Sequence, residues 1–348
     1  MVTREDYNPI FIDMKSVLLG FSGGIDSCTA AEILLGEGYR VVALTIDTIG
    51  DEAMLSRAEA KAREIGIEWL RYDACTLFRR EIIDYFIAEY HKGRTPAPCT
   101  RCNTLIKWHI LESVANEYDI EHIATGHYFN IEMQDGKHYV AKGLDPAKDQ
   151  SYYLWGLRQE TLQRALTPMG NRIKSEVKER FSDKSESMGI CFLSGRHYAD
   201  FLQSEGAAMH DGAILTTDGT VIGYHNGIAR YTIGQRRGSG IPEGKRVVDI
   251  DAQNNTITIG DNALLFKHRI HIAECNIVDR KELLAATDIT IKIRGIGRNP
   301  ELPVAINPCG EGYTITTRDA MWAPAKGQPL VFYRNNLVLG GGIVVGFD

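Results

Sequence analysis

The chain has 348 residues, of which 44% are hydrophobic and 24% charged, and its formal net charge is -6. This length exceeds one ordinary core and predicts about two or three domains, while no apolar run reaches the roughly 20 residues of a membrane-spanning helix. The N-terminus carries acids and a proline where a secretory signal has a basic start and an apolar stretch, so we expect a cytoplasmic protein. Seven cysteines, an odd number in a long chain, argue against a disulfide framework.

The negative charge is unevenly distributed along the chain. Residues 1–90 hold 9 Lys/Arg against 16 Asp/Glu, and the rest of the chain holds 30 against 29. Basic patches beyond residue 90 could therefore still bind a polyanion such as a nucleic acid.

Strands and helices alternate over the first third of the chain. Short apolar runs predict buried strands, and longer segments between them predict helices. The expected strands are 16–21, 39–46, 68–73 and 121–127, and the expected helices are 26–37, 52–66, 76–93 and 103–117. This alternation predicts an α/β fold with a doubly wound parallel sheet that helices cover on both faces.

The pattern is helical over residues 150–205, with a charged amphipathic helix at 174–189 that Gly189 closes. From about residue 206 the period changes to two, with turn sequences such as Asp218-Gly219, which predicts two small barrels or sandwiches meeting near residue 272. The expected domains are an α/β catalytic domain with a helical extension at 1–205, a central β domain at 206–272 and a C-terminal β-barrel at 273–348.

A glycine-rich loop, GFSGGIDS at residues 20–27, joins the first expected strand to the first expected helix. Its glycines allow close backbone approach to a phosphate, which the serines and the first N–H groups of the helix could bind. The loop has no Walker lysine, and its glycine spacing is not that of a dinucleotide fingerprint. From spacing alone, a tight turn with Asp26 as helix cap explains the loop as well as phosphate binding does.

Two cysteines three residues apart lie in TPAPCTRCN, residues 95–103. Cys102 directly precedes the expected helix, whose dipole would lower its thiol pKa and favour the thiolate. A CxxC pair in a loop binds metal, does redox work or supplies a nucleophile, but structural zinc is disfavoured because no second CxxC or paired histidine motif follows.

A third cysteine, Cys191, follows a glycine turn in SMGICFL, residues 187–193, on what reads as a short apolar strand. In isolation such a cysteine is most often a small buried hydrophobe. The same interpretation applies to Cys28, Cys75, Cys275 and Cys309.

Several motifs occur together in one order, and SGGIDS by itself resembles the pyrophosphate-binding loop of the ATP pyrophosphatases. The ordered set is SGGIDS, PAPCTRCN, ATGHY, AKDQSYYL, ESMGICF, RYTIGQRRG and GQPLVFYRNNLVLGGG. This order resembles the tRNA-specific 2-thiouridylases over nearly the whole chain. The resemblance implies that ATP with Mg²⁺ adenylates the C2 oxygen of the wobble uridine and that sulfur then displaces AMP. The implied nucleotide-binding residues are Gly20, Phe21, Ser22, Gly23, Gly24, Ile25, Asp26, Ser27, Ile46 and Gly126.

The resemblance gives the thiols two possible roles. In the family's usual scheme Cys191 receives a persulfide from a sulfur-donor protein, and Cys102 attacks it and leaves a disulfide. Cys99 departs from the common pattern, because most members carry a catalytic aspartate there. Three thiols would instead suit a [4Fe-4S] cluster with one iron free for sulfide, as in related tRNA thiolases. We keep both routes open.

The implied partner is the anticodon loop of tRNA, whose target base must be turned out of the loop to react. The implied tRNA-binding residues are Ala97, Pro98, Cys99, His127, Lys148, Asp149, Gln150, Arg294, Gly295 and Gln328. Clustered basic side chains add to them, namely Arg230, Arg236, Arg237, Lys245, Arg246, Lys292 and Arg298. Two alternatives remain, an amidating ATP pyrophosphatase with a small acceptor and a non-catalytic RNA-binding relative.

Overall fold

The computed structural model describes residues 15–179, 189–207, 209–294 and 302–348. The second half of the helix expected at 174–189, and the positions of Gly295 and Arg298, lie outside these residues. Within them, no helix is long and apolar enough to cross a membrane.

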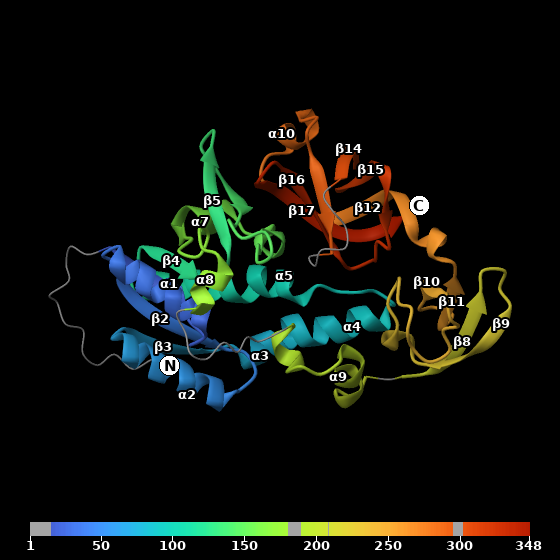
Figure 1. Cartoon of the computed structure of the whole chain (residues 1–348), viewed down its shortest axis with the longest axis horizontal. Helices are drawn as coiled ribbons and strands as arrows, with labels where there is room; N and C mark the ends of the chain where they lie inside the picture. Colours follow the sequence, from blue (N-terminus) through green and yellow to red (C-terminus); the bar gives the residue numbers. More distant parts are fainter. Residues whose placement is uncertain (1–14, 180–188, 208, 295–301) are drawn as a thin grey trace.

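A five-stranded parallel sheet forms the N-terminal part of the molecule, in the order β3-β2-β1-β4-β7 (Figure 1). Its strands are β1 (Ser16–Gly20), β2 (Arg40–Asp47), β3 (Glu68–Asp73), β4 (His122–Thr125) and β7 (Ala165–Leu166). Alternate residues of β1 enter different cores: Leu18 joins a cluster with Leu111 of α6, and Leu19 joins one with Leu34 of α1. Because apolar side chains are buried on both faces, the sheet is doubly wound, and the expected fold class is confirmed.

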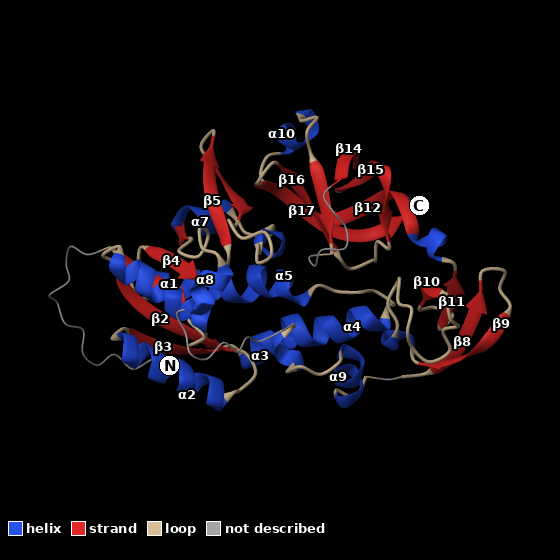
Figure 2. Ribbon diagram, viewed as in Figure 1, coloured by secondary structure: helices blue, strands red, loops and turns tan. Residues whose placement is uncertain are grey.

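The helices of this part are α1 (Ile25–Gly36), α2 (Glu52–Ile65), α3 (Cys75–Phe78), α4 (Tyr85–His91), α5 (Pro98–Cys102), α6 (Trp108–Glu117), α7 (Gln159–Arg164), α8 (Lys174–Glu179) and α9 (Tyr198–Ser204). Helices α1, α2 and α6 pack on the parallel sheet, whereas α4 and α9 extend from it toward the four-stranded sheet that follows (Figure 2). Two π-helical segments, η2 (Arg79–Asp84) and η3 (Asn103–Lys107), connect α3 to α4 and α5 to α6 without a break.

The helix expected from Asn103 therefore begins five residues earlier, at Pro98. Proline is favourable at the first helical position because its missing N–H has no partner there and its φ is already helical. Cys102 consequently lies a full turn inside the helix, so the expectation that it directly precedes the helix is wrong.

A four-stranded sheet follows in the order β10-β11-β8-β9. Its strands are β8 (Asp211–Thr216), β9 (Val221–Asn226), β10 (Arg246–Asp251) and β11 (Thr256–Gly260), and only β8 and β11 pair in parallel. Its core contains Ile214, Val247 and Ile257, which are completely buried. The period-two alternation predicted this β structure.

The C-terminal strands form a barrel, since β12 pairs with both β15 and β17 in the order β12-β15-β14-β13-β16-β17. They are β12 (Phe266–Ile277), β13 (Thr290–Ile293), β14 (Leu302–Cys309), β15 (Gly312–Trp322), β16 (Pro329–Arg334) and β17 (Leu337–Phe347), with helix α10 (Arg280–Ala285) before β13. Strand β12 runs through residue 272, where the sequence analysis expected two β domains to meet, so we propose a boundary just before Phe266.

A hairpin from the N-terminal part extends the barrel sheet. Strands β5 (Phe129–Gln134) and β6 (Lys137–Lys142) leave the parallel sheet after β4, and β6 pairs with β17 through Ala141 and Leu337. The Lys142 N–H also donates to the Asn336 carbonyl at 2.9 Å. The barrel is thus attached to the hairpin that directly follows β4 of the parallel sheet.

Candidate active site

A cavity of about 360 Å³ opens at the carboxyl ends of β1, β2 and β4. This edge is where open α/β sheets bind their ligands, and the volume is in the range of small-molecule sites. Residues from several separate segments line it, among them Ser22, Asp26, Ser27, Ile46, Cys102, Lys107, Gly126, His127, Gln150 and Cys191. The fold therefore brings the glycine loop together with two of the three singled-out cysteines.

The glycine loop is packed too closely for larger residues. Gly23 has φ +68°, and a Cβ there would lie 2.8 Å from the Ala58 Cα, while a Cβ on Gly126 would lie 3.1 Å from the Ser27 nitrogen. The Ser22 N–H donates to Ser27 Oγ at 3.3 Å. Helix α1 begins at Ile25 with no side-chain cap, so Asp26 lies in its first turn and is not a cap. Uncapped N–H groups beside closely packed glycines fit the phosphates of ATP.

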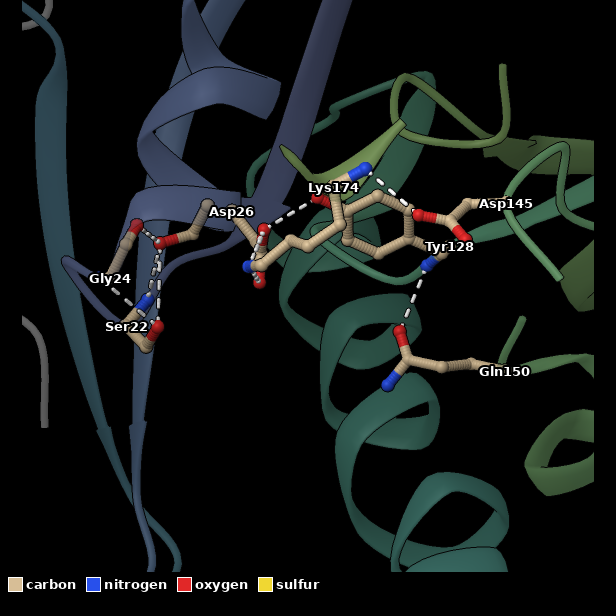
Figure 3. Close-up of polar contacts among 8 residues, drawn as sticks. Ser22, Gly24, Asp26, Tyr128, Asp145, Gln150 and Lys174 are labelled. Carbon is tan, nitrogen blue, oxygen red and sulfur yellow. Dashed lines mark hydrogen bonds and ion pairs between the residues drawn. The ribbon is translucent and has the colours of Figure 1, made fainter. Parts of the chain in front are cut away.

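The carboxylate of Asp26 is held by two residues that the sequence analysis did not single out (Figure 3). The Lys174 Nζ lies 2.6 and 2.7 Å from the two Asp26 oxygens, and the Tyr128 hydroxyl donates to Asp26 Oδ1 at 2.7 Å. Lys174 is buried, and its backbone N–H donates to Asp145 Oδ2 at 3.0 Å. This network fixes the one acidic side chain that lines the cavity within the described residues.

Cys102 is buried, and burial raises the pKa of its thiol to about 12, against a smaller lowering effect of Lys107. Burial also raises the pKa of Cys99, which is half-buried in the first turn of α5 and does not line the cavity. The expectation of a helix-lowered pKa at Cys102 is therefore wrong, because the thiol lies inside the helix and away from water. At neutral pH Cys102 is a neutral thiol.

Cys191 is exposed and begins a 3₁₀ turn, Cys191–Leu193, in place of the expected strand. The next residue, Phe192, anchors this turn in edge-to-face contacts with Phe78 and Phe86, at ring-centroid distances of 5.9 and 5.2 Å. Aromatic packing therefore carries Cys191 to the wall of the cavity. Its exposure contradicts the interpretation as a buried hydrophobe.

The remaining cysteines lie elsewhere. Cys28 is buried in the core on the α1 face, which raises its pKa to about 11. Cys75 and Cys275 are half-buried, but Cys309 is exposed, so the interpretation as a buried hydrophobe is wrong for Cys309.

Lys107 is a further residue of the cavity that the sequence analysis did not single out. It ends the π-helical segment η3, whose i→i+5 turn brings residues five apart onto one side and so places Lys107 on the side of Cys102. Burial lowers the pKa of Lys107. The electrostatic effect of Cys102, Cys191 and Cys99 raises that pKa by more, so the pKa lies above its ordinary value. Burial, with a contribution from Lys107, lowers the pKa of His127 to about 3, so its ring is neutral at physiological pH.

No three His, Cys, Asp or Glu side chains of the described ranges come close enough together to hold one metal ion.

Several expected tRNA-binding side chains have partners within the protein. Gln150 Oε1 accepts from the Tyr128 N–H at 2.9 Å, and Asp149 accepts from the N–H groups of Gly143 and Ser151 at 3.1 Å. The Arg294 guanidinium donates to the Ile233 carbonyl at 2.9 Å.

Of the clustered basic side chains in the β region, some are bound to other groups of the protein and some are not buried. Lys245 is ion-paired with Asp261 at 2.8 Å, whereas Arg236 and Arg237 are exposed. These two guanidinium groups are accessible to an anionic partner.

The parallel sheet, the glycine loop after its first strand and the cavity at its carboxyl edge define a nucleotide-binding enzyme of the ATP pyrophosphatase class. Three family models match the chain: the tRNA methyl transferase HUP domain over residues 15–195, the tRNA methyl transferase PRC-barrel domain over 199–261, and the aminomethyltransferase beta-barrel domain over 267–344. They account together for almost the whole chain.

Curated relatives match over nearly their full length. The tRNA-specific 2-thiouridylase MnmA 1 of Bacteroides fragilis is 40% identical, with 96% of this chain and 98% of the relative covered. The tRNA-specific 2-thiouridylases MnmA of Chlorobium luteolum and Clostridioides difficile are 37% and 35% identical, each over 95% of this chain and over 96% and 98% of their own lengths. The chain belongs to the family of the tRNA-specific 2-thiouridylases, which confirms the resemblance.

Proposed function

We propose that this protein is a tRNA-uridine 2-sulfurtransferase, which uses ATP to adenylate the C2 oxygen of the wobble uridine and replaces that oxygen with sulfur. The observation that carries the proposal is that Cys102 and Cys191 line the same cavity as the glycine loop. An amidating pyrophosphatase would use the loop but has no role for two cysteines beside it. A non-catalytic RNA-binding relative would need neither.

In this proposal the glycine loop and the N–H groups of α1 bind the ATP phosphates, and Ile46 lies where the nucleotide base would bind. Asp26, the one acidic side chain of the cavity lining within the described residues, would hold Mg²⁺, and the bound ion would neutralise charge on the phosphates. The Lys174 ion pair and the Tyr128 hydrogen bond keep that carboxylate oriented. A preoriented site avoids the cost of arranging these groups during the reaction.

The sulfur step follows from the different exposure of the two cysteines. Cys191 is exposed, so a sulfur-donor protein could reach it and leave a persulfide. The Cys102 sulfur attacks the inner sulfur of the Cys191 persulfide anion, which forms the Cys102–Cys191 disulfide, and the outer sulfur leaves with the Cys102 proton as hydrosulfide. Hydrosulfide attacks C2 of the adenylated uridine, and AMP leaves with the C2 oxygen. An external reductant must then supply two electrons to restore the two thiols.

We choose the persulfide route because Cys102 and Cys191 line one cavity and Cys99 does not. Iron and sulfide analysis of protein purified without oxygen tests this choice. Two or more iron atoms per active chain would favour the cluster.

The anticodon loop of tRNA is the proposed macromolecular substrate. Arg236 and Arg237 are exposed for phosphate contact, and His127 and Gln150 lie in the cavity where the extruded base would enter. We assign tRNA backbone binding to the two β regions and base chemistry to the α/β region.

The test incubates the protein with unmodified tRNA, ATP and a persulfide or sulfide donor, and measures AMP and 2-thiouridine by mass spectrometry. The proposal predicts AMP and 2-thiouridine in equal amounts, both dependent on tRNA. AMP release with ammonia and small acceptors but not with tRNA would instead support the amidating reading. tRNA binding without any ATP cleavage would support the non-catalytic one.

A further inference from the structure

A turn of the C-terminal barrel contacts the segment that leads to the CxxC pair. We name residues 326–328, just before β16, the barrel turn, and residues 93–97 the approach segment. The Thr95 N–H donates to the Lys326 carbonyl at 2.8 Å, and the Gln328 Nε2 donates back to the Thr95 carbonyl at 2.7 Å and to Pro96 at 3.5 Å. The two segments, more than 230 residues apart, are therefore joined in both directions.

The packing at this contact is close. Gly327 has φ +89°, and a Cβ there would lie 3.3 Å from Arg94 Cβ and from the backbone of Thr95. Next along the chain, the Pro329 carbonyl accepts from the buried Tyr152 hydroxyl at 2.7 Å. The barrel turn is thus fixed on the α/β region at two separate points.

The four-stranded sheet contacts the same approach segment. A Cβ on Gly93 would lie 2.7 Å from Ile250 Cγ2, in β10. The approach segment therefore touches both β regions before it enters helix α5.

The connection from this contact to the cysteines is short and stiff. Pro96 and Pro98 have restricted φ, and the Ala97 carbonyl accepts from the N–H and the hydroxyl of Thr100 at 3.2 and 2.7 Å. A shift of Thr95 and Pro96 is therefore transmitted to the first turn of α5, which carries Cys99 and leads to Cys102. Misplacement of a reacting group by about 1 Å can lower a rate by about 100-fold.

We propose that Gln328 is a positioning residue for sulfur transfer: it acts through the Thr95 and Pro96 carbonyls on Cys99 and Cys102. The inference rests on the proposed function. It assigns the Gln328 amide to the protein itself, where the family resemblance implied a contact with tRNA. Only a donor suits this place, because both partners are carbonyl oxygens.

The test compares Gln328→Ala and Gln328→Glu with the unchanged chain in single turnovers at saturating ATP and tRNA. We expect 2-thiouridine to form about 10-fold more slowly with Gln328→Ala. Gln328→Glu should be slower still, because a carboxylate cannot donate and is repelled by the carbonyls. The tRNA Kd and the rate of tRNA-dependent pyrophosphate release should stay within about twofold, because neither depends on the thiols. Gln253→Ala, at an exposed glutamine between β10 and β11, is the matched control.

A second readout does not require turnover. Iodoacetamide should alkylate Cys99 about fivefold or more faster in Gln328→Ala than in the unchanged chain, because the approach segment is released. Tyr152→Phe removes the other anchor with the loss of one hydroxyl and should shift both readouts in the same direction.

Different results overturn different claims. A weakened tRNA Kd in Gln328→Ala with an unchanged sulfur-transfer rate would make Gln328 a tRNA contact and overturn the inference, as would unchanged thiolation and alkylation. Absence of 2-thiouridine with the unchanged chain would defeat the proposed function, while altered alkylation in the variants would still support the mechanical link.

Discussion

The Lys174 ammonium lies 2.6 and 2.7 Å from the two carboxylate oxygens of Asp26, although 148 residues separate them in sequence. Helix α8 is thereby linked to the first turn of α1, beside the glycine loop. Lys174 is buried, so its charge needs a partner, and Asp26 supplies it. The same contact holds Asp26 at the wall of the cavity.

Lys174→Met should slow tRNA-dependent pyrophosphate release about 10-fold or more, because Asp26 loses the partner that orients it. It should also lower the free energy of unfolding by about 1–2 kcal/mol, a modest loss because Asp26 is partly exposed. Quench-flow measurement of pyrophosphate and urea unfolding check the two effects. Tyr128→Phe, which removes one hydrogen bond to the same carboxylate, should give a smaller change in each. Full pyrophosphate release by Lys174→Met would remove Lys174 from the account.

The reactivity of Cys102 should increase steeply with pH. Its pKa is raised to about 12 by burial, so below that pH the neutral thiol predominates, and the thiolate fraction grows about 10-fold per pH unit between pH 7 and 10. Alkylation of Cys102, followed by mass spectrometry, should follow this slope. The free energy of unfolding should change in the opposite direction to the reactivity. The contribution of the buried neutral thiol is fully present below the ordinary thiol pKa of 9.0 and is lost as the pH rises toward 12. An alkylation rate that levels off near pH 8 would contradict the burial of the thiol.

Lys107→Met should make Cys102 less reactive at every pH in that range. The Lys107 ammonium lowers the thiol pKa, and its removal should slow alkylation by about three- to 10-fold, since one pKa unit is a factor of ten. Lys61→Met, at a half-buried lysine on α2 that is ion-paired with Glu64, is the control for the loss of one positive charge and should leave the rate unchanged. Equal rates in all three proteins would show that Lys107 does not act on the thiol.

Binding of tRNA should weaken steeply with added salt, and Arg236 and Arg237 should contribute to that dependence. Replacing both by alanine should reduce the slope of log K against log salt concentration by about 1.5, since each phosphate contact contributes about 0.7 to 0.9. Filter binding or fluorescence anisotropy at several potassium chloride concentrations measures it. A slope equal to that of the unchanged chain would place the tRNA backbone elsewhere.

The parallel sheet could be predicted from the sequence because its strands are continuous apolar runs. The part of the cavity formed by the glycine loop could also be predicted, because the loop directly follows β1. The hairpin β5–β6 was missed although its signal was present: Asp135-Gly136 lies between two alternating segments. Its pairing with β17 depends on contacts between distant segments, which local pattern does not encode.

Local sequence pattern did not reveal Lys174 or Lys107 as site residues, and it placed Cys191 on a buried strand. Lys174 lies on a charged helix, where a lysine ordinarily faces water, and only packing against α1 buries it beside Asp26. In a regular α-helix, Lys107 and Cys102, which are five residues apart, would point in different directions. The π-helical segment η3 places them on the same side of the helix. Cys191 reaches the cavity because Phe192 packs on α3 and α4. Tertiary packing overrides the local pattern for Lys174 and Cys191, and a π-helical turn does so for Lys107.

The most direct test of the sulfur chemistry looks for a covalent link between Cys102 and Cys191 after a single turnover. The protein is loaded with persulfide sulfur, mixed with ATP and tRNA, quenched with acid and digested without reductant for mass spectrometry. We expect one Cys102–Cys191 disulfide for each 2-thiouridine formed, and neither product with Cys191→Ser. Stoichiometric 2-thiouridine from a chain in which Cys102 and Cys191 remain unlinked would contradict it.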